Sequence, residues 1–357
     1  MSYRDQRLAK DLEEIRDGIY DLGTRVETAL GNAVQSLLTR DLELAYRTII
    51  EDNPINRRSE ELDKECHYFI ARHLPSAGHL RFISSALRMI ILLERMGDYA
   101  VTICRETVQI SVPLAGSFRD ELEELAKEAL LVFSHALQSF KAEDAALART
   151  TIADARKTEH VFGATLELLI EAPTPQLEKT DLFGRLIVLS QLERVSDQAK
   201  NLCEETLFFI TGERKERRRV NILFIEPPAS GLGMLAASIG QTFFSDRATF
   251  HYCSETDSPD QSQAVETFTD SHDLILDVSA KWPCKNLQER LASVDIVIGI
   301  NVLYSEFVEP VPFHTVAMDW WMDENNFSDP ASAYPFLRQR IESLVLTMRG
   351  TKPARAE

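Results

Sequence analysis

Two pairs of carboxylates stand at helical spacing in this sequence. Glu94 and Asp98 are four residues apart, and so are Glu193 and Asp197. Residues four apart lie on one face of an α-helix, so each pair can present both carboxylates in the same direction. Clustered carboxylate oxygens suit hard divalent cations, and they suit iron when several carboxylates bridge the ions. The spacing therefore indicates two candidate metal-binding stripes.

Each stripe continues for one more helical turn with a further oxygen-bearing side chain. Thr102 follows Asp98 by four residues, and Asn201 follows Asp197 by the same interval. A single pair of acids on a helix is usually solvated or paired with arginine, and that alternative applies here too. It is weakened by the occurrence of the same pattern twice in a chain whose other positions have diverged.

The two stripes belong to an internal repeat. Residues 93–104 (LERMGDYAVTIC) recur 99 positions later as residues 192–203 (LERVSDQAKNLC). Eight residues of the preceding segments are identical to residues 103 positions later, namely Ala33, Gln35, Ser36, Asp41, Leu44, Ala45, Thr48 and Ile49. The two offsets differ by about the length of a loop change between helices. We therefore expect a duplicated unit.

Apolar residues at helical spacing predict three long helices in each copy of the repeat. The predicted helices are residues 5–38, 41–72, 79–112, 118–141, 143–171 and 177–211. Pro54 should bend or locally break the second helix unless its backbone groups are repaired. The prediction for the N-terminal part is thus an all-α double three-helix bundle, with repeats over residues 1–114 and 115–213.

The pattern changes after a charged run at residues 214–219, which we interpret as a basic linker. Short apolar runs then alternate with helical stretches, which predicts a small α/β domain with a mostly parallel sheet over residues 220–350, followed by a tail at 351–357. Three consecutive residues in this domain, Trp320, Trp321 and Met322, are expected to belong to its core; the alternative is that they are exposed and form an interaction patch.

The composition restricts the class of partner. The 357 residues include 56 acids against 39 Lys and Arg, for a net charge of -17, which argues against nucleic-acid binding and favours metal cations or basic protein surfaces. No apolar run is long enough to span a bilayer. The five cysteines have no close C-x-x-C spacing and no apolar signal core begins the chain, so we expect reduced thiols and a cytoplasmic protein.

The doubled motif resembles the E-x-x-x-D-x-x-x-N signatures of the PhoU family of phosphate-signalling proteins, and the resemblance covers roughly residues 1–213. It implies a two-repeat helical protein that holds a divalent metal or iron through Glu94, Asp98, Glu193, Asp197 and Asn201. Thr102 stands where the family has Asn. The resemblance therefore implies two unequal sites, of which the second is the more complete.

The same resemblance implies a function. Members of this family act as negative regulators of phosphate uptake, together with a phosphate ABC transporter ATPase and a sensor histidine kinase. We accordingly expect a non-enzymatic regulator that works by protein contact, and that reaches the inner face of the membrane only through its partners. The sequence leaves open whether the chain forms a homodimer.

Residues 221–226 and the loop after them resemble the opening of low-molecular-weight tyrosine phosphatases and arsenate reductases. Glu226 stands in the position of the nucleophilic cysteine, and Leu232 in that of the arginine which clamps the oxyanion. A carboxylate there repels a phosphate dianion, and loss of the arginine removes the bidentate clamp. We therefore predict a catalytically inactive domain that binds a ligand or docks a partner.

The remnants of this anion loop are few. The candidate residues are Glu226, Ser230, Gly231, Gly233 and Asp329. Asp329 matches the general acid of that family, but we expect it to cap the helix that begins near Pro330. Two other functions stay open: a phosphatase or arsenate reductase with a rearranged active site, and a helical protein that stores metal.

Overall fold

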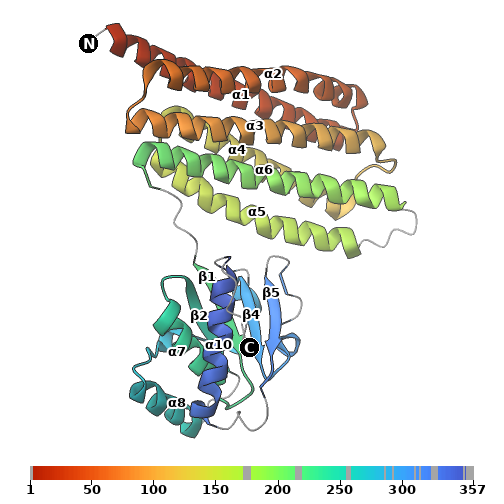
Figure 1. Ribbon diagram of the computed structural model, residues 1–357. Helices are drawn as coiled ribbons and strands as arrows, with labels where there is room; N and C mark the ends of the chain where they lie inside the picture. The colour runs from red at the N-terminus through yellow and green to blue at the C-terminus, as the bar shows by residue number, and fades with distance from the viewer. Residues whose placement is uncertain are drawn as a thin grey trace. The chain divides into compact units, whose positions relative to one another are not determined.

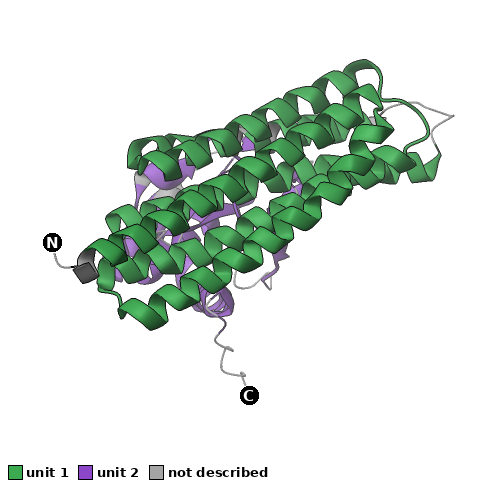
Figure 2. Ribbon diagram, turned by 90° about the horizontal axis from the view of Figure 1, so that it is seen from above, with its two compact units in different colours: residues 1–216 green, residues 217–357 purple. Residues whose placement is uncertain are grey.

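The computed structural model describes residues 3–171, 178–213, 219–254, 259–284, 287–291, 293–308, 311–312, 315–322, 329–348 and 350. The chain divides into two compact units, residues 1–216 and 217–357, which Figure 2 colours separately. Each unit has its own apolar core. In the described part of the chain, no helix combines the length and the apolar composition needed to cross a bilayer.

Long helices that lie side by side make up the first unit (Figure 1). They are α1 (Tyr3–Thr39), α2 (Leu42–His73), α3 (Ala77–Gln109), α4 (Gly116–Ala142), α5 (Ala145–Glu171) and α6 (Lys179–Thr211). All six predicted helices are present, and their ends differ from the predicted ones by up to three residues. The apolar positions that predicted them, such as Ile19, Leu22 and Leu30, are fully buried.

Pro54 lies inside α2, yet the helix continues from Leu42 to His73. Proline has no N–H to donate to the carbonyl four residues earlier, which here belongs to Ile50. The side-chain amide of the preceding residue, Asn53, donates to that carbonyl oxygen at 3.2 Å. The expected break is therefore absent because a neighbouring side chain replaces the missing backbone donor.

Equivalent helices of the two repeats carry the same local hydrogen bonds 103 residues apart. Asp41 and Asp144 accept hydrogen bonds from the N–H of Leu44 and Leu147 at the start of α2 and α5. The same correspondence relates Ser36 bonded to the Ala33 carbonyl with Ser139 bonded to that of Ala136, and Thr48 bonded to Leu44 with Thr151 bonded to Leu147. These shared bonds establish the alignment of α2 with α5 residue by residue.

The acidic stripes lie on α3 and α6, and these two helices pack directly against each other. Arg88 of α3 donates two hydrogen bonds to the carboxylate of Glu205 on α6, at 2.5 and 2.6 Å, and its guanidinium lies over the ring of Phe208. Such bidentate, charge-assisted pairs are stronger than neutral hydrogen bonds. The two repeats are therefore joined through the helices that carry the motifs.

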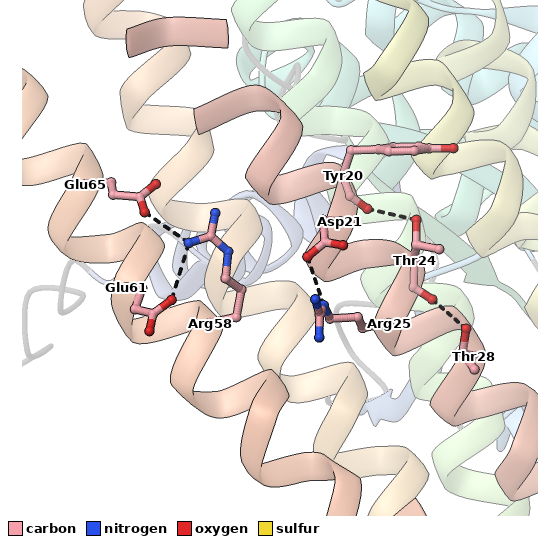
Figure 3. A network of polar contacts seen from close by, with 8 residues as sticks. All are labelled: Tyr20, Asp21, Thr24, Arg25, Thr28, Arg58, Glu61 and Glu65. Atoms are coloured by element: carbon pink, nitrogen blue, oxygen red, sulfur yellow. Dashed lines mark hydrogen bonds and ion pairs between the residues drawn. The ribbon is translucent and has the colours of Figure 1, made fainter. Parts of the chain in front are cut away.

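Acids on the exposed face of α1 and α2 have arginine partners (Figure 3). Arg58 donates to Glu61 at 3.4 Å and to Glu65 at 3.0 Å, and Arg25 donates to Asp21 at 2.8 Å. Exposed ion pairs of this kind contribute about 0 to 1 kcal/mol each to stability. This face has the solvated, arginine-paired arrangement that is usual for helical acids.

A parallel sheet forms the second unit, in the strand order β3-β2-β1-β4-β5. The strands are β1 (Val220–Ile225), β2 (Ala248–Cys253), β3 (Lys281–Trp282), β4 (Ile296–Ile300) and β5 (Val316–Trp320), and the helices are α7 (Leu232–Phe244), α8 (Pro259–Ser271), α9 (Leu287–Leu291) and α10 (Pro330–Met348). The predicted parallel α/β architecture is therefore confirmed.

The central strand β1 is buried on both of its faces. Ile222 and Phe224 point into the core formed with α7, α8 and α10, whereas Leu223 and Ile225 point into a second cluster that includes α9. Burial on both sides explains why β1 is a continuous apolar run without polar alternation.

Cys253 and Cys284 form a disulfide, with their Cα atoms 5.7 Å apart. The lack of close C-x-x-C spacing and of an apolar signal core predicts reduced thiols, and for this pair that prediction is wrong. The strands β2 and β3 are neighbours in the sheet, so the end of β2 meets the connection that follows β3. Sequence spacing alone does not contain this proximity.

A buried carboxylate attaches the α3–α4 connection to α6. Asp181, 1% exposed, accepts hydrogen bonds from the N–H and hydroxyl of Ser111 at 2.8 and 2.9 Å and from the N–H of Val112 at 2.8 Å. Burial raises the pKa of Asp181, but these bonds and the charge of Arg185 outweigh it, so the pKa lies below its usual value.

We predict that Asp181→Asn lowers the free energy of unfolding by about 2 to 3 kcal/mol at pH 7. The amide has one oxygen and an NH2 group that cannot accept, so it cannot accept all three of these hydrogen bonds. An aspartate with a lowered folded pKa stabilises the fold above its unfolded pKa of about 3.9 and loses that contribution as pH falls through the folded value. The difference in the free energy of unfolding between wild type and variant, measured with denaturant, should therefore become smaller below about pH 4.

The matched control is Asp120→Asn, since the side chain of Asp120 is 78% exposed and should tolerate the change. The role given to this carboxylate is contradicted if wild type and Asp181→Asn have the same free energy of unfolding at pH 7, or if their difference is the same at pH 7 and pH 3.

Candidate metal centre

Three carboxylates from two helices lie in the same region of the first repeat. Glu94 and Asp98 lie one turn apart on α3, the charge of Asp98 acts on Asp52 of α2, and the charges of Asp98 and Asp52 act on Glu94. Gly97 lies between the two acids of α3, where an added β-carbon would be 3.3 Å from Oδ1 of Asp52. The absence of a side chain at this position therefore lets the carboxylate of α2 approach α3.

Two acceptor oxygens at this place are buried without a hydrogen-bond donor. Asn56, one turn after Asp52 on α2, donates its Nδ2 to Oδ2 of Asp52 at 2.7 Å. Oδ1 of Asp52 and Oδ1 of Asn56 have no hydrogen-bond partner in the described structure. Buried acceptors nearly always have a donor or a cation beside them, so this pair of oxygens is an exception that needs an explanation.

The electrostatics of this cluster disfavour the charged form of Asp52 and Glu94. Burial raises the pKa of Asp52, and the charge of Asp98 raises it further. Burial likewise raises the pKa of Glu94, with additional contributions from Asp98 and Asp52. Arg95 and Arg105 offset only part of this effect. A cation placed among the three acids would remove the repulsion between them.

The donor set fits a hard cation, although the side chains are not gathered around one. Carboxylate oxygens and an amide oxygen are the ligands that divalent cations such as Mn²⁺ prefer. Within the described residues, no three or more His, Cys, Asp or Glu side chains are close enough together to hold an ion. Coordination at this place therefore requires the acidic side chains to turn toward one another.

The second repeat places its two acids differently. Glu193 and Asp197 of α6 line a small cavity of about 10 Å³, whose other walls are Ala155, Thr158, Ser196 and Lys200. Nζ of Lys200 lies 2.7 Å from Oδ1 of Asp197. An ammonium group therefore stands beside one of the predicted ligands.

The third position of each stripe takes no part in these arrangements. Asn201 is not among the residues that line the cavity of the second repeat. The hydroxyl of Thr102 donates to the backbone carbonyl of Asp98 at 2.9 Å, so it bonds to its own helix and not to the carboxylate. The structure thus brings together Glu94 with Asp98 and Glu193 with Asp197, but neither third residue joins its pair.

The sequence motif missed Asp52, Asn56 and Lys200. The first two lie on the preceding helix, about 40 residues before the motif, where no fixed spacing connects them with it. A usable signal existed in the repeat itself, because the offset of 103 aligns Asp52 with Ala155 and the offset of 99 aligns Val101 with Lys200. Differences between the two copies at ligand-bearing faces would have identified these positions.

The predicted anion loop of the second unit is occupied by its own carboxylate. Glu226, 2% exposed, accepts hydrogen bonds through Oε2 from the N–H of Gly233 at 2.8 Å and from the hydroxyl of Ser230 at 2.9 Å. Gly231 precedes α7 with φ of 71°, a left-handed conformation that glycine adopts easily. The carboxylate thus takes donors at the helix N-terminus that an external anion would use.

Two other residues of this unit lie apart from the loop. Asp329 is exposed and its backbone carbonyl accepts from the N–H groups of Ser332 and Ala333, so it begins α10 as a capping residue would. Trp320 and Met322 are buried, as predicted, whereas Trp321 is 57% exposed and the prediction of a core position is wrong for it. Alternation along the chain after β5 turns this one side chain outward.

We predict that Asp52→Asn stabilises the metal-free protein by about 1 kcal/mol at pH 7, because it removes one charge from the repelling cluster while keeping an acceptor for Asn56. Since the folded pKa of Asp52 is raised, the wild type gains stability as pH falls, and the advantage of the variant should disappear below about pH 4. Unfolding in denaturant with a chelator present measures it. Glu51→Gln, on the exposed neighbouring position, is the control, and an unchanged or lowered stability of Asp52→Asn contradicts the repulsion.

Comparison with known proteins assigns the helical unit. Residues 19–107 and 122–206 each match the model of the PhoU domain. The chain is 26% identical over 204 residues to the phosphate-specific transport system accessory protein PhoU of Serratia marcescens, covering 57% of this chain and 84% of that protein. It is 28% identical over 213 residues to the PhoU homolog of Pseudomonas aeruginosa, covering 58% of this chain and 86% of that protein.

Solved structures agree with this assignment. The crystal structure of the phosphate transport system regulatory protein PhoU from Streptococcus pneumoniae aligns with a TM-score of 0.55 at 25% identity, over 58% of this chain and 99% of the other. That of PhoU from Pseudomonas aeruginosa aligns with a TM-score of 0.54 at 28% identity, over 57% and 99%. The helical unit of this chain therefore belongs to the PhoU family and consists of two PhoU domains in tandem.

Proposed function

We propose that this protein is a PhoU-type negative regulator of phosphate uptake that acts by contact with other proteins. The observation that carries the proposal is the presence of both acidic motifs, Glu94 with Asp98 and Glu193 with Asp197, inside two matched PhoU domains. Relatives that are 26% and 28% identical to this chain are named as accessory proteins of the phosphate-specific transport system. The partners are a phosphate ABC transporter ATPase and a sensor histidine kinase, and the site of action is the cytoplasm.

The regulator is cation-dependent through its first repeat. Asp52, Glu94 and Asp98 hold a divalent metal or iron, with the side-chain oxygen of Asn56 as a further ligand. The donorless oxygens of Asp52 and Asn56 and the like-charge repulsion support this role. The ion supplies positive charge that joins α2 to α3, so its binding stiffens the face of the bundle on which these helices meet.

The second unit serves as a docking or ligand-sensing domain without turnover. Glu226 occupies the donors at the start of α7, which leaves them unavailable to a phosphate group. A buried carboxylate bonded to N–H and O–H groups is a poor nucleophile compared with an activated thiolate. The exposed indole of Trp321 offers an apolar contact for a partner, since aromatic side chains are enriched in protein interfaces.

The charge of the whole chain favours basic partner surfaces. With a net charge of -17, the protein attracts lysine-rich and arginine-rich faces over distances of about 8 Å at physiological salt. Contact with such a face on a transporter ATPase or kinase would bring the regulator to a membrane complex through its partners.

We predict that deleting the gene raises the expression of phosphate-uptake genes severalfold in phosphate-rich medium, because the negative regulator is lost. A plasmid copy of the wild type should restore repression, whereas a copy with Asp52→Ala and Asp98→Ala should not. Glu51→Gln, which changes an exposed acid outside the cluster, should restore it fully. Transcript levels in high and low phosphate measure the effect. Unchanged expression in the deletion strain contradicts the regulatory function and favours a metal-storing role.

An enzymatic function is the second candidate, and the resemblance of residues 221–233 to phosphatases and arsenate reductases motivates it. It requires that Glu226 act in a rearranged active site. Incubation of the protein with a generic aryl phosphate and with arsenate separates the two functions. Robust turnover that disappears in Glu226→Ala would overturn the assignment as a non-enzymatic regulator.

A further inference from the structure

The two repeats differ at the positions that surround their acidic pairs. The internal alignment pairs Asp52 with Ala155 and Val101 with Lys200. The second repeat therefore has no carboxylate at the position of Asp52, although Glu159 aligns with Asn56, and it has a lysine where the first repeat has an apolar residue. Glu159 adds one negative charge and the other two changes each remove one, so these positions are less negative by one unit in the second repeat.

Two further positions of the helix interface also differ. Gly97 corresponds to Ser196 and Ile55 to Thr158. The hydroxyl of Ser196 donates to that of Thr158 at 3.2 Å, so two hydroxyl groups bond each other where the first repeat brings a carboxylate against a glycine. At these two positions, the contact between α5 and α6 is made by neutral groups.

Lys200 occupies the acidic face itself. Its side chain is 22% exposed, and Nζ lies 2.7 Å from Oδ1 of Asp197 on the preceding turn. The cavity beside it, about 10 Å³, has room for roughly one water molecule. A divalent ion bound by Asp197 and Glu193 in this cavity would lie next to the ammonium group, and the two positive charges would repel each other.

We propose that Lys200 is the resident counter-ion of the second repeat, and that the pair Glu193 and Asp197 consequently takes no metal. This inference rests on the proposed metal role of the first repeat. It implies that, of the two acidic motifs, only the motif of the first repeat binds a cation. This is the opposite of what the third stripe positions imply, since Asn201 in place of Thr102 would make the second site the more complete one.

The experiment transfers the residues of the first repeat into the second. Ala155→Asp with Lys200→Val reproduces the first repeat at both aligned positions, and equilibrium dialysis of the full-length protein against Mn²⁺ counts bound ions per chain. The wild type should bind one ion, which Asp98→Ala abolishes and Asp197→Ala leaves in place. The double variant should bind one ion more than the wild type, and Asp197→Ala in that background should remove the additional one.

Controls keep the outcomes distinct. Lys127→Val replaces an exposed lysine, 64% exposed, and should add no ion. Lys200→Gln, which keeps most of the side-chain length, tests the charge alone and should bind a second ion more weakly than the double variant does. Circular dichroism and the elution volume in gel filtration confirm that each variant is folded before ions are counted.

Two results would overturn the inference: loss of a bound ion from the wild type on Asp197→Ala, or no additional ion in the folded double variant. If the wild type binds no Mn²⁺ but the double variant binds one, the metal role proposed for the first repeat fails while the assignment of Lys200 stands. The failure of one proposal is therefore distinguishable from the failure of the other.

Discussion

The packing of α3 against α6 is the contact on which the rest of the helical unit depends, because both acidic motifs lie on these two helices. Arg88 and Glu205 join them by a bidentate pair, and Phe82 meets Phe209 edge to face with ring centroids 5.4 Å apart. Each motif helix is thereby held on one side by its counterpart from the other repeat. Its acidic residues face the second helix of their own repeat, which is α2 or α5. The residues of that second helix therefore differ around the two acidic pairs.

That division explains how one duplicated motif gives two chemically different places. On α2, Asn53 repairs the backbone at Pro54, and the helix continues so that Asp52 and Asn56 reach the acids of α3. On α5, Ala155 contributes no ligand, and Lys200 of α6 neutralises part of the remaining charge. Duplication has preserved the acids on the central helices, whereas substitutions at the surrounding positions determine whether a cation is needed to balance them.

Much of this architecture follows from the sequence, because helical periodicity and the internal repeat are local properties of the chain. The six helices, the acidic pairs and the parallel α/β unit are all present where the patterns predict them. What the patterns omit arises between segments distant in sequence: Asp52 beside Glu94, and Cys253 beside Cys284. At Glu226, sequence reasoning predicted repulsion of an external anion, and the structure adds that this carboxylate itself takes the helix N-terminal donors.

The central claim is that the acidic motif of the first repeat alone accommodates a cation. Anomalous diffraction from crystals of the wild-type protein grown with Mn²⁺, recorded near the manganese edge, tests it most directly. The account predicts one anomalous peak per helical unit, beside the carboxylates of Asp52, Glu94 and Asp98. A peak between Glu193 and Asp197, or the absence of any peak beside Asp52, would contradict it.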